Sequence, residues 1–304
     1  MIFIKEFLDN LPSIKPIPTQ EKFENRLKDK DKIKAIIFDV YGTLIISASG
    51  DVHESEISHR NLDHALSYGN FFINGLTEEE RNNITSSILH SFYQEIRNQQ
   101  ELLKKKNEYP FPEVEIRDVW KKVIAKAESE NKIRVSECSH MDRMIFTYEL
   151  LSNKIYPMPN LKETILDLQN KGYVLGIVSN AQFYTPIILN YFLNQIFDLD
   201  ENILGFPNNL SVFSYQYGIG KPDVKLYNIL TDSLEKNYHI KANESIFIGN
   251  DMLKDVLPAQ KAGMQTALFA GDKRSLRLRR EEKEVKNISP DLVITSFDQI
   301  TKIF

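Results

Sequence analysis

The chain has 304 residues, of which 42% are hydrophobic and 26% are charged, a composition typical of a globular protein with a sizeable core. The formal net charge of -4 gives no globally basic surface, so neither a nucleic acid nor an anionic membrane is expected as a partner. No apolar run approaches the roughly 20 residues that a membrane-spanning helix needs. The single cysteine, Cys138, cannot form an intramolecular disulfide, and charged residues interrupt the apolar start of the chain too early for a signal peptide. We therefore expect a cytoplasmic protein.

The first predicted strand begins after a short N-terminal segment. Residues 1–32 contain three prolines and end in a charged stretch, which predicts an extension that packs on, or leads into, the main domain. The run from Ile33 to Phe38 is β-branched and aromatic, as in a buried strand. It ends abruptly at Asp39.

Residues 49–154 favour helices. Thr77 and Glu80 have the spacing of a capping box, and apolar residues recur after it at helical spacing. Further helices are predicted over about 119–127 and 141–151. We therefore expect residues 49–154 to form an all-helical insert.

Strand-like and helix-like runs alternate in the rest of the chain. Asn160 and Gly172 are predicted to cap a helix that begins at Leu161. Strands are predicted over 173–178, 211–213, 245–248, 266–270 and 292–295, with helices over about 184–193, 224–234 and 255–262 between them. Such alternation indicates right-handed βαβ units. The predicted fold class is therefore α/β, with a Rossmann-like doubly wound parallel sheet formed by residues 33–48 and 155–304.

Polar side chains follow the predicted strands where these end. They are Asp39 and Thr43, then Ser179 and Asn180, then Asn250, Asp251 and Asp255, with Lys221 in the loop before a helix. Because ligands of open parallel sheets bind beyond the carboxyl ends of the strands, these side chains are expected to converge. They supply a carboxylate that can attack, groups that can hold an anion and acidic groups for a hard cation, as phosphoryl transfer requires. Gly42 permits a tight turn beside Asp39, where amide groups could point at an anion.

Four segments in this order resemble the motifs of the haloacid dehalogenase superfamily. They are Phe38-Asp-Val-Tyr-Gly-Thr-Leu44, Val178-Ser-Asn180, Gly220-Lys-Pro-Asp223 and Gly249-Asn-Asp-Met-Leu-Lys-Asp255. The resemblance covers roughly residues 33–48 and 155–300. The helical insert stands where that superfamily carries its substrate-selecting cap, which implies a cap of the helical (C1) type.

The resemblance implies a role for each matching residue. Asp39 would be the nucleophile, Thr43 and Ser179 would hydrogen-bond the substrate anion, and Lys221 would neutralise charge on Asp39 and on the substrate. Magnesium would be held by Asp251, Asp255, one oxygen of Asp39 and the backbone carbonyl of Tyr41. Further contacts to a small anionic substrate are expected from Tyr41, Gly42, Asn180 and the two insert arginines Arg97 and Arg117, because an arginine can clamp a carboxylate or phosphate bidentately.

Two positions separate the possible activities. In phosphatases of this superfamily the residue two after the nucleophile is usually an aspartate that protonates the leaving group, whereas here it is Tyr41, as in hydrolytic 2-haloacid dehalogenases. The acidic pair Asp251 and Asp255, in contrast, resembles the phosphatase pattern. We predict a magnesium-dependent phosphatase that acts on a small phosphorylated metabolite through an aspartyl-phosphate intermediate. The alternatives are a metal-free 2-haloacid dehalogenase and a catalytically weak binding or regulatory protein.

A basic run from Lys273 to Arg280 follows the strand predicted over 266–270. Three glutamates follow it at once, which favours a solvated helix with internal charge pairing over a site for an acidic partner or a polyphosphate. The substrate, the oligomeric state and a contribution of Asn250 to the metal site are left open by the sequence.

Overall fold

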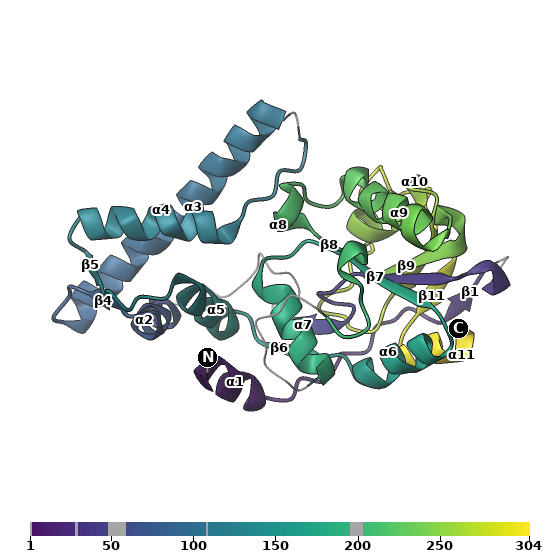
Figure 1. Cartoon of the computed structure of the whole chain (residues 1–304), viewed down its shortest axis with the longest axis horizontal. Coiled ribbons are helices and arrows are strands. Elements are labelled where there is room, and N and C mark those ends of the chain that lie inside the picture. Colours follow the sequence, from purple (N-terminus) through teal and green to yellow (C-terminus); the bar gives the residue numbers. More distant parts are fainter. Residues whose placement is uncertain (1, 28–29, 48–58, 108, 195–202) are drawn as a thin grey trace. The chain divides into compact units, whose positions relative to one another are not determined.

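The computed structural model describes residues 2–27, 30–47, 59–107, 109–194 and 203–304 and divides the chain into two compact units (Figure 1). The insert unit comprises Met1–Leu11 and Ser55–Lys154, and the core unit comprises Pro12–Glu54 and Ile155–Phe304. Residues 1–32, predicted as one extension, are thus divided between the two units. The predicted boundary at residues 48 and 49 lies outside the described residues. No helix in the described ranges is long and apolar enough to cross a membrane.

The described part of the core unit contains a seven-stranded sheet with the order β1-β11-β10-β9-β2-β7-β8. Its strands are β1 (Glu24–Asn25), β2 (Ala35–Phe38), β7 (Val174–Ser179), β8 (Ser211–Phe213), β9 (Ser245–Gly249), β10 (Gln265–Phe269) and β11 (Leu292–Ile294). All neighbouring pairs are parallel except β1 with β11. The predicted doubly wound parallel sheet is confirmed. The two-residue strand β1 shows no periodicity and was not predicted.

Helices cover both faces of this sheet, which explains why β2 is buried along its whole length. Figure 1 shows α9 (Val224–Tyr238) and α10 (Leu257–Lys261) on one face and α6 (Leu161–Asn170), α7 (Tyr184–Asn194) and α11 (Phe297–Ile303) on the other. The shorter elements are α8 (Ser214–Tyr217), the antiparallel pair β3 (Ile45–Ser47) and β6 (Ile155–Pro157), 3-10 turns at Lys30–Lys32, Asn208–Leu210 and Ala242–Glu244, and a π-helical turn at Met252–Val256.

The strand order places a topological switch point at β2. The chain passes from β2 to β7 and β8 on one side, and then returns to β9, β10 and β11 on the other. Phe38, the last residue of β2, pairs with Ile177 of β7 and with Ile248 of β9, so the three carboxyl ends lie at the same edge. Ligand crevices in such sheets form at this point.

The insert unit is mainly helical, as predicted. It contains α1 (Ile2–Asp9), α2 (His59–Tyr68), α3 (Glu78–Asn107), α4 (Ile116–Ser129) and α5 (Met141–Ser152). The capping box is confirmed, because the Glu80 amide donates to Thr77 Oγ1 (3.1 Å) and the Thr77 amide donates to Glu80 Oε2 (3.0 Å). An antiparallel pair, β4 (Phe71–Ile73) and β5 (Ile133–Val135), was not expected in an all-helical insert. Three-residue strands are too short to give a periodic signal.

Two local predictions differ from the structure. Asn160 is the N-cap residue of α6, as predicted, but its side chain makes no capping bond and instead donates to Asp298 Oδ1 at 2.6 Å. The basic run from Lys273 to Arg280 forms turns rather than a helix. Its arginines reach acidic residues and carbonyl groups outside the glutamate cluster that follows, and these tertiary contacts replace the expected internal pairing.

Candidate active site

Asp39 lies at the switch point, immediately after β2. Its amide donates to the carbonyl of Ile248 (2.9 Å), which fixes the backbone against β9. Its Oδ1 accepts from Ser179 Oγ (3.0 Å) and from Lys221 Nζ (2.6 Å). Within the described residues Oδ2 has no hydrogen-bond partner. One oxygen of the carboxylate is therefore held in place, while the other is left to react or to bind a cation.

Lys221 links Asp39 to Asp255, which lies in the π-helical turn after β9. Its Nζ also lies 2.7 Å from Asp255 Oδ1, and the side chains of Lys221 and Asp255 are each 2% exposed. The backbone amide of Lys221 donates to Asn180 Oδ1 (2.7 Å). Asn180, predicted to contact substrate, thus positions the lysine in this structure.

Burial and charge shift the ionisation of this cluster. Burial alone would lower the pKa of Lys221, but the charges of Asp255 and Asp39 outweigh it and raise that pKa above its ordinary value. For Asp255, burial and the charges of Asp39 and Asp251 together raise the pKa to about 7 against the opposing effect of Lys221. The lysine is therefore charged at neutral pH, whereas Asp255 titrates near neutrality.

A tight turn ties the loop after β2 to the loop after β9. Gly42 has φ +85, and a Cβ there would lie 2.6 Å from Ser275 Cβ and 2.7 Å from Asn250 Nδ2. Asn250 Nδ2 donates to the Ser275 carbonyl (2.6 Å), and Asn250 Oδ1 accepts from the buried Thr43 hydroxyl (3.2 Å). Thr43 and Asn250 thus link the loops of the site to each other. The predicted contact of Thr43 with substrate stays a prediction.

Asp251 is held by two different sets of donors. Its Oδ1 accepts from the amides of Leu253 (2.8 Å) and Lys254 (3.1 Å), and Arg279 Nη2 lies 2.7 Å from its Oδ2. The amide of Asp251 donates to Asp255 Oδ2 at 2.9 Å. Gly249 makes this packing possible, because a Cβ there would lie 2.5 Å from Asp255 Cγ.

The donor chemistry of the site fits magnesium. Asp39, Asp251 and Asp255 supply carboxylate oxygens, the ligands that Mg²⁺ prefers, and Asp39 Oδ2 is open. Nevertheless, the described residues contain no group of three or more acidic, histidine or cysteine side chains already arranged around a metal position. The carboxylates contact Lys221 and Arg279 instead. Metal binding would thus require at least Asp251 to exchange a partner.

The family model for haloacid dehalogenase-like hydrolases matches residues 33–263 of the chain. The chain belongs to this family. Two curated relatives are named glyceraldehyde 3-phosphate phosphatase. The one from Methanothermobacter thermautotrophicus is 24% identical over 153 residues, covering 48% of this chain and 58% of the relative. The one from Pyrococcus furiosus is 28% identical over 151 residues, covering 48% and 53%. The chain spans a little over half the length of these relatives.

The fold is also similar to that of a solved family member. The 2-haloacid dehalogenase from Pseudomonas syringae pv. tomato DC3000 superimposes with a TM-score of 0.53 at 17% identity, over 89% of this chain and 97% of that one. This similarity bears on the fold alone.

The structure describes the surroundings of three residues of this chain that were predicted to contact the substrate. The Tyr41 side chain is buried, and its hydroxyl lies 3.1 Å from Thr185 Oγ1 at the start of α7. In the insert unit, Arg97 is exposed on α3 and Arg117 pairs with Glu115 (2.6 Å). A contact of either arginine with the substrate stays a prediction.

Arg279 and Ser275 were missed as residues of the site. Both come from the long connection between β10 and β11, which has neither strand nor helix periodicity. The only signal in the sequence was the density of basic residues between Lys273 and Arg280. The density of basic residues indicated a charged segment, but it did not indicate that Arg279 would pair with Asp251.

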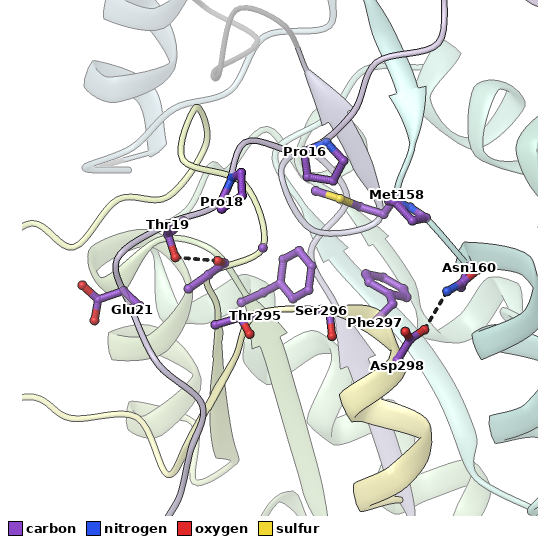
Figure 2. Close-up of a pocket in the computed structure, with 14 residues that line it drawn as sticks. Pro16, Pro18, Thr19, Glu21, Met158, Asn160, Thr295, Ser296, Phe297 and Asp298 are labelled. Atoms are coloured by element: carbon purple, nitrogen blue, oxygen red, sulfur yellow. Dashed lines mark hydrogen bonds between the residues drawn. The ribbon is translucent and has the colours of Figure 1, made fainter.

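A separate cavity of about 410 Å³ lies in the core unit beyond the ends of β10 and β11 (Figure 2). Pro16 and Pro18 of the N-terminal segment form one wall, Phe297 lies opposite, and Phe269 also lines the cavity. The segment is held there by a hydrogen bond from Thr19 to the Ala270 carbonyl (2.9 Å). None of the predicted site residues and no basic side chain is among the residues that line it. This cavity therefore does not suit an anionic substrate.

Proposed function

We propose that this protein is a magnesium-dependent phosphatase that hydrolyses a small phosphate monoester through an aspartyl-phosphate at Asp39. The observation that carries the proposal is the state of Asp39, whose Oδ1 is held by Ser179 and Lys221 while Oδ2 has no partner among the described residues. The names of the two curated relatives support a phosphorylated substrate, with glyceraldehyde 3-phosphate as the first metabolite to test. In this proposal the insert unit is the cap that selects the substrate.

The proposed reaction has two steps at phosphorus. Asp39 Oδ2 attacks the phosphorus atom, and the bond from phosphorus to the leaving oxygen breaks with its electron pair on that oxygen. Lys221 offsets the negative charge of Asp39 and of the phosphoryl oxygens, and the hydroxyl of Ser179 orients the carboxylate. Water then attacks the phosphorus of the aspartyl phosphate, which releases inorganic phosphate and restores the carboxylate.

Magnesium, when bound by Asp39, Asp251, Asp255 and the backbone carbonyl of Tyr41, would neutralise charge on the phosphoryl oxygens. The matching residues of this chain fit that role by their donor chemistry. The raised pKa of Asp255 means that this ligand loses its proton near neutral pH, so metal binding favours neutral or alkaline solution.

Tyr41 constrains which leaving groups react well. The position two residues after the nucleophile carries a phenol bonded to Thr185 rather than a carboxylic acid, so the leaving oxygen takes its proton from water or from the substrate itself. The proposal therefore predicts faster hydrolysis of esters whose leaving group is a weak base than of alkyl phosphates such as glyceraldehyde 3-phosphate.

The same tyrosine favours the second candidate function, dehalogenation of a 2-haloacid. There Asp39 Oδ2 would attack carbon, the halide would depart without a proton, and water would open the resulting ester. An acidic pair such as Asp251 and Asp255 suits a divalent cation, which this reaction does not require, and for this reason we place the phosphatase first.

Hydrolysis of an aryl phosphate by wild type and by Asp39→Asn, each with and without magnesium, tests the proposal. We expect metal-dependent turnover that falls by about three orders of magnitude or more in Asp39→Asn. Asp232→Asn, an exposed position on α9, is the matched control and should keep wild-type turnover. Halide release from 2-haloacids without metal would instead establish the dehalogenase. Absence of both activities would leave the catalytically weak binding or regulatory protein.

A further inference from the structure

Arg279 forms a two-pronged ion pair with Asp251. Its Nη2 lies 2.7 Å from Oδ2, and its Nε lies 3.2 Å from Oδ2 and 3.3 Å from Oδ1. The Asp251 side chain is 7% exposed and that of Arg279 is 27% exposed. Planar guanidinium groups bind carboxylates strongly in this arrangement, and limited solvent access screens the pair little.

This pair occupies Asp251 where a metal ion would bind. Oδ1 already accepts from the amides of Leu253 and Lys254, so with Arg279 in place both carboxylate oxygens are engaged. A divalent cation on Oδ2 would stand next to the guanidinium, and two adjacent cations repel each other. Asp251 can therefore serve Arg279 or magnesium, but not both in this arrangement.

The backbone at Arg279, from which this side chain reaches Asp251, has an uncommon conformation. Its φ is +52, a left-handed conformation that a non-glycine residue adopts at a cost, and the Glu282 amide closes the turn on the Arg279 carbonyl (2.9 Å). Other arginines of the basic run contact different groups. Arg280 pairs with Glu21, and Arg274 donates to the Lys15 carbonyl.

The loop does not depend on the ion pair for its attachment to the core unit. The Arg277 amide donates to the Asn250 carbonyl and the Met252 amide to the Arg277 carbonyl, each at 2.9 Å. Around these bonds, apolar side chains from the loop and from the segment after β9 form a cluster that includes Met252, Val256, Leu276, Leu278 and Val285. Loss of the guanidinium should therefore leave the loop docked.

We infer that Arg279 is an internal cation that competes with magnesium for Asp251 and so lowers the metal affinity of the site. The inference rests on the proposed function, because it takes Asp251 as a magnesium ligand. In this inference Arg279 acts through Asp251 and is a positioning residue, not a catalytic one. This competition means that magnesium binds the site only at concentrations high enough to displace the guanidinium group of Arg279.

Calorimetric titration with Mg²⁺ alone, on the full chain without substrate, tests this inference. Arg279→Gln removes the competing charge, and we expect its Kd for magnesium to be about tenfold lower than that of wild type, because a charged hydrogen-bonded pair no longer has to be broken. Arg280→Gln removes a neighbouring charge of the same loop and should leave the Kd unchanged. A Kd for Arg279→Gln equal to or above the wild-type value would overturn the inference.

Two further comparisons make the outcome unambiguous. Arg279→Lys keeps the charge but not the two-pronged geometry, so its Kd should lie between those of wild type and Arg279→Gln. If Arg279→Gln fails to fold, a Kd for Arg279→Lys equal to or above that of wild type overturns the inference on its own. If wild type binds magnesium and no variant binds it more tightly, the inference fails while the proposed function stands. If neither wild type nor any variant binds magnesium, the metal-dependent function itself fails.

Discussion

Lys221 Nζ donates to Asp39 Oδ1 across 2.6 Å, although 182 residues separate the two in the chain. The same ammonium group contacts Asp255, so one buried cation pairs with two buried carboxyl groups. Removing one partner of a buried ionic cluster leaves uncompensated charge in a poorly solvated place. We therefore expect the lysine to contribute to the stability of the core unit as well as to the proposed chemistry.

Substitution of Lys221 tests this dependence. We expect Lys221→Met to lower the free energy of unfolding by about 3–5 kcal/mol, because Asp39 and Asp255 would face each other unpaired. Urea denaturation followed by circular dichroism measures the loss. Lys225→Met, at an exposed position of α9, is the control and should change the free energy by no more than about 0.5 kcal/mol. Equally small losses of unfolding free energy in both variants would show that the ion pairs of Lys221 contribute little to stability.

Alanine substitutions at Gly42 and Gly172 distinguish the destabilisation caused by steric contact from that caused by backbone strain. Both have a left-handed φ, +85 and +86, but a Cβ at Gly42 would collide with Ser275 and Asn250, whereas nothing lies within 4 Å of a Cβ at Gly172. We expect Gly172→Ala to cost about 1 kcal/mol through strain alone and Gly42→Ala to cost about twice that or more. Thermal unfolding of both variants makes the comparison, and similar costs would mean that the loops around Gly42 yield easily.

The thermal stabilisation of the protein by magnesium should depend on pH, because Asp255 must lose its proton to bind the metal. Because burial raises the pKa of this carboxyl to about 7, the group contributes stability below its ordinary pKa, and that contribution is lost as pH rises through about 7. Magnesium requires the deprotonated form, so the rise in melting temperature on adding magnesium should be small near about pH 5.5 and larger near about pH 8. Scanning calorimetry at both pH values measures it. In Asp255→Asn the pH dependence should flatten, and a pH-independent shift in wild type would contradict the prediction.

Trp120 lies at the centre of the insert unit. Its side chain is 1% exposed and stacks on Phe92 with 4.3 Å between ring centroids, while Tyr148 meets it edge-on. Trp120→Ala should destabilise the insert unit by about 3–5 kcal/mol, since it removes a large buried ring. Urea denaturation followed by circular dichroism gives this value. Phe111→Ala, where the ring is 43% exposed, is the aromatic control, and a comparable loss there would refute the assignment of Trp120 to the core of this unit.

Trp120 also gives a spectroscopic check, because the chain has one tryptophan. Its buried position predicts blue-shifted fluorescence in the native state, and unfolding of the insert unit should move the emission to the red. Emission already at the wavelength of a solvated indole in the native protein would contradict the structure around α4.

Much of the fold could be predicted from local pattern. The strand that ends at Phe38 and the capping box at Thr77 and Glu80 depend on residues close in the chain, and the structure contains both. What failed or was missed lies where local pattern is weak. Two- and three-residue strands have no measurable period. The Asn160 side chain donates to Asp298, which is distant in the chain, and not to the amides of its own helix.

The sequence alone determined where the strands end and which polar residues follow them, because those signals depend on neighbouring residues. From these ends it predicted the convergence of Asp39, Ser179 and Asp255, which the parallel register brings about. Only the tertiary structure decided their partners. Lys221 bridges two carboxylates and Arg279 takes Asp251, since each pairing depends on the path of a loop held by contacts distant in the chain.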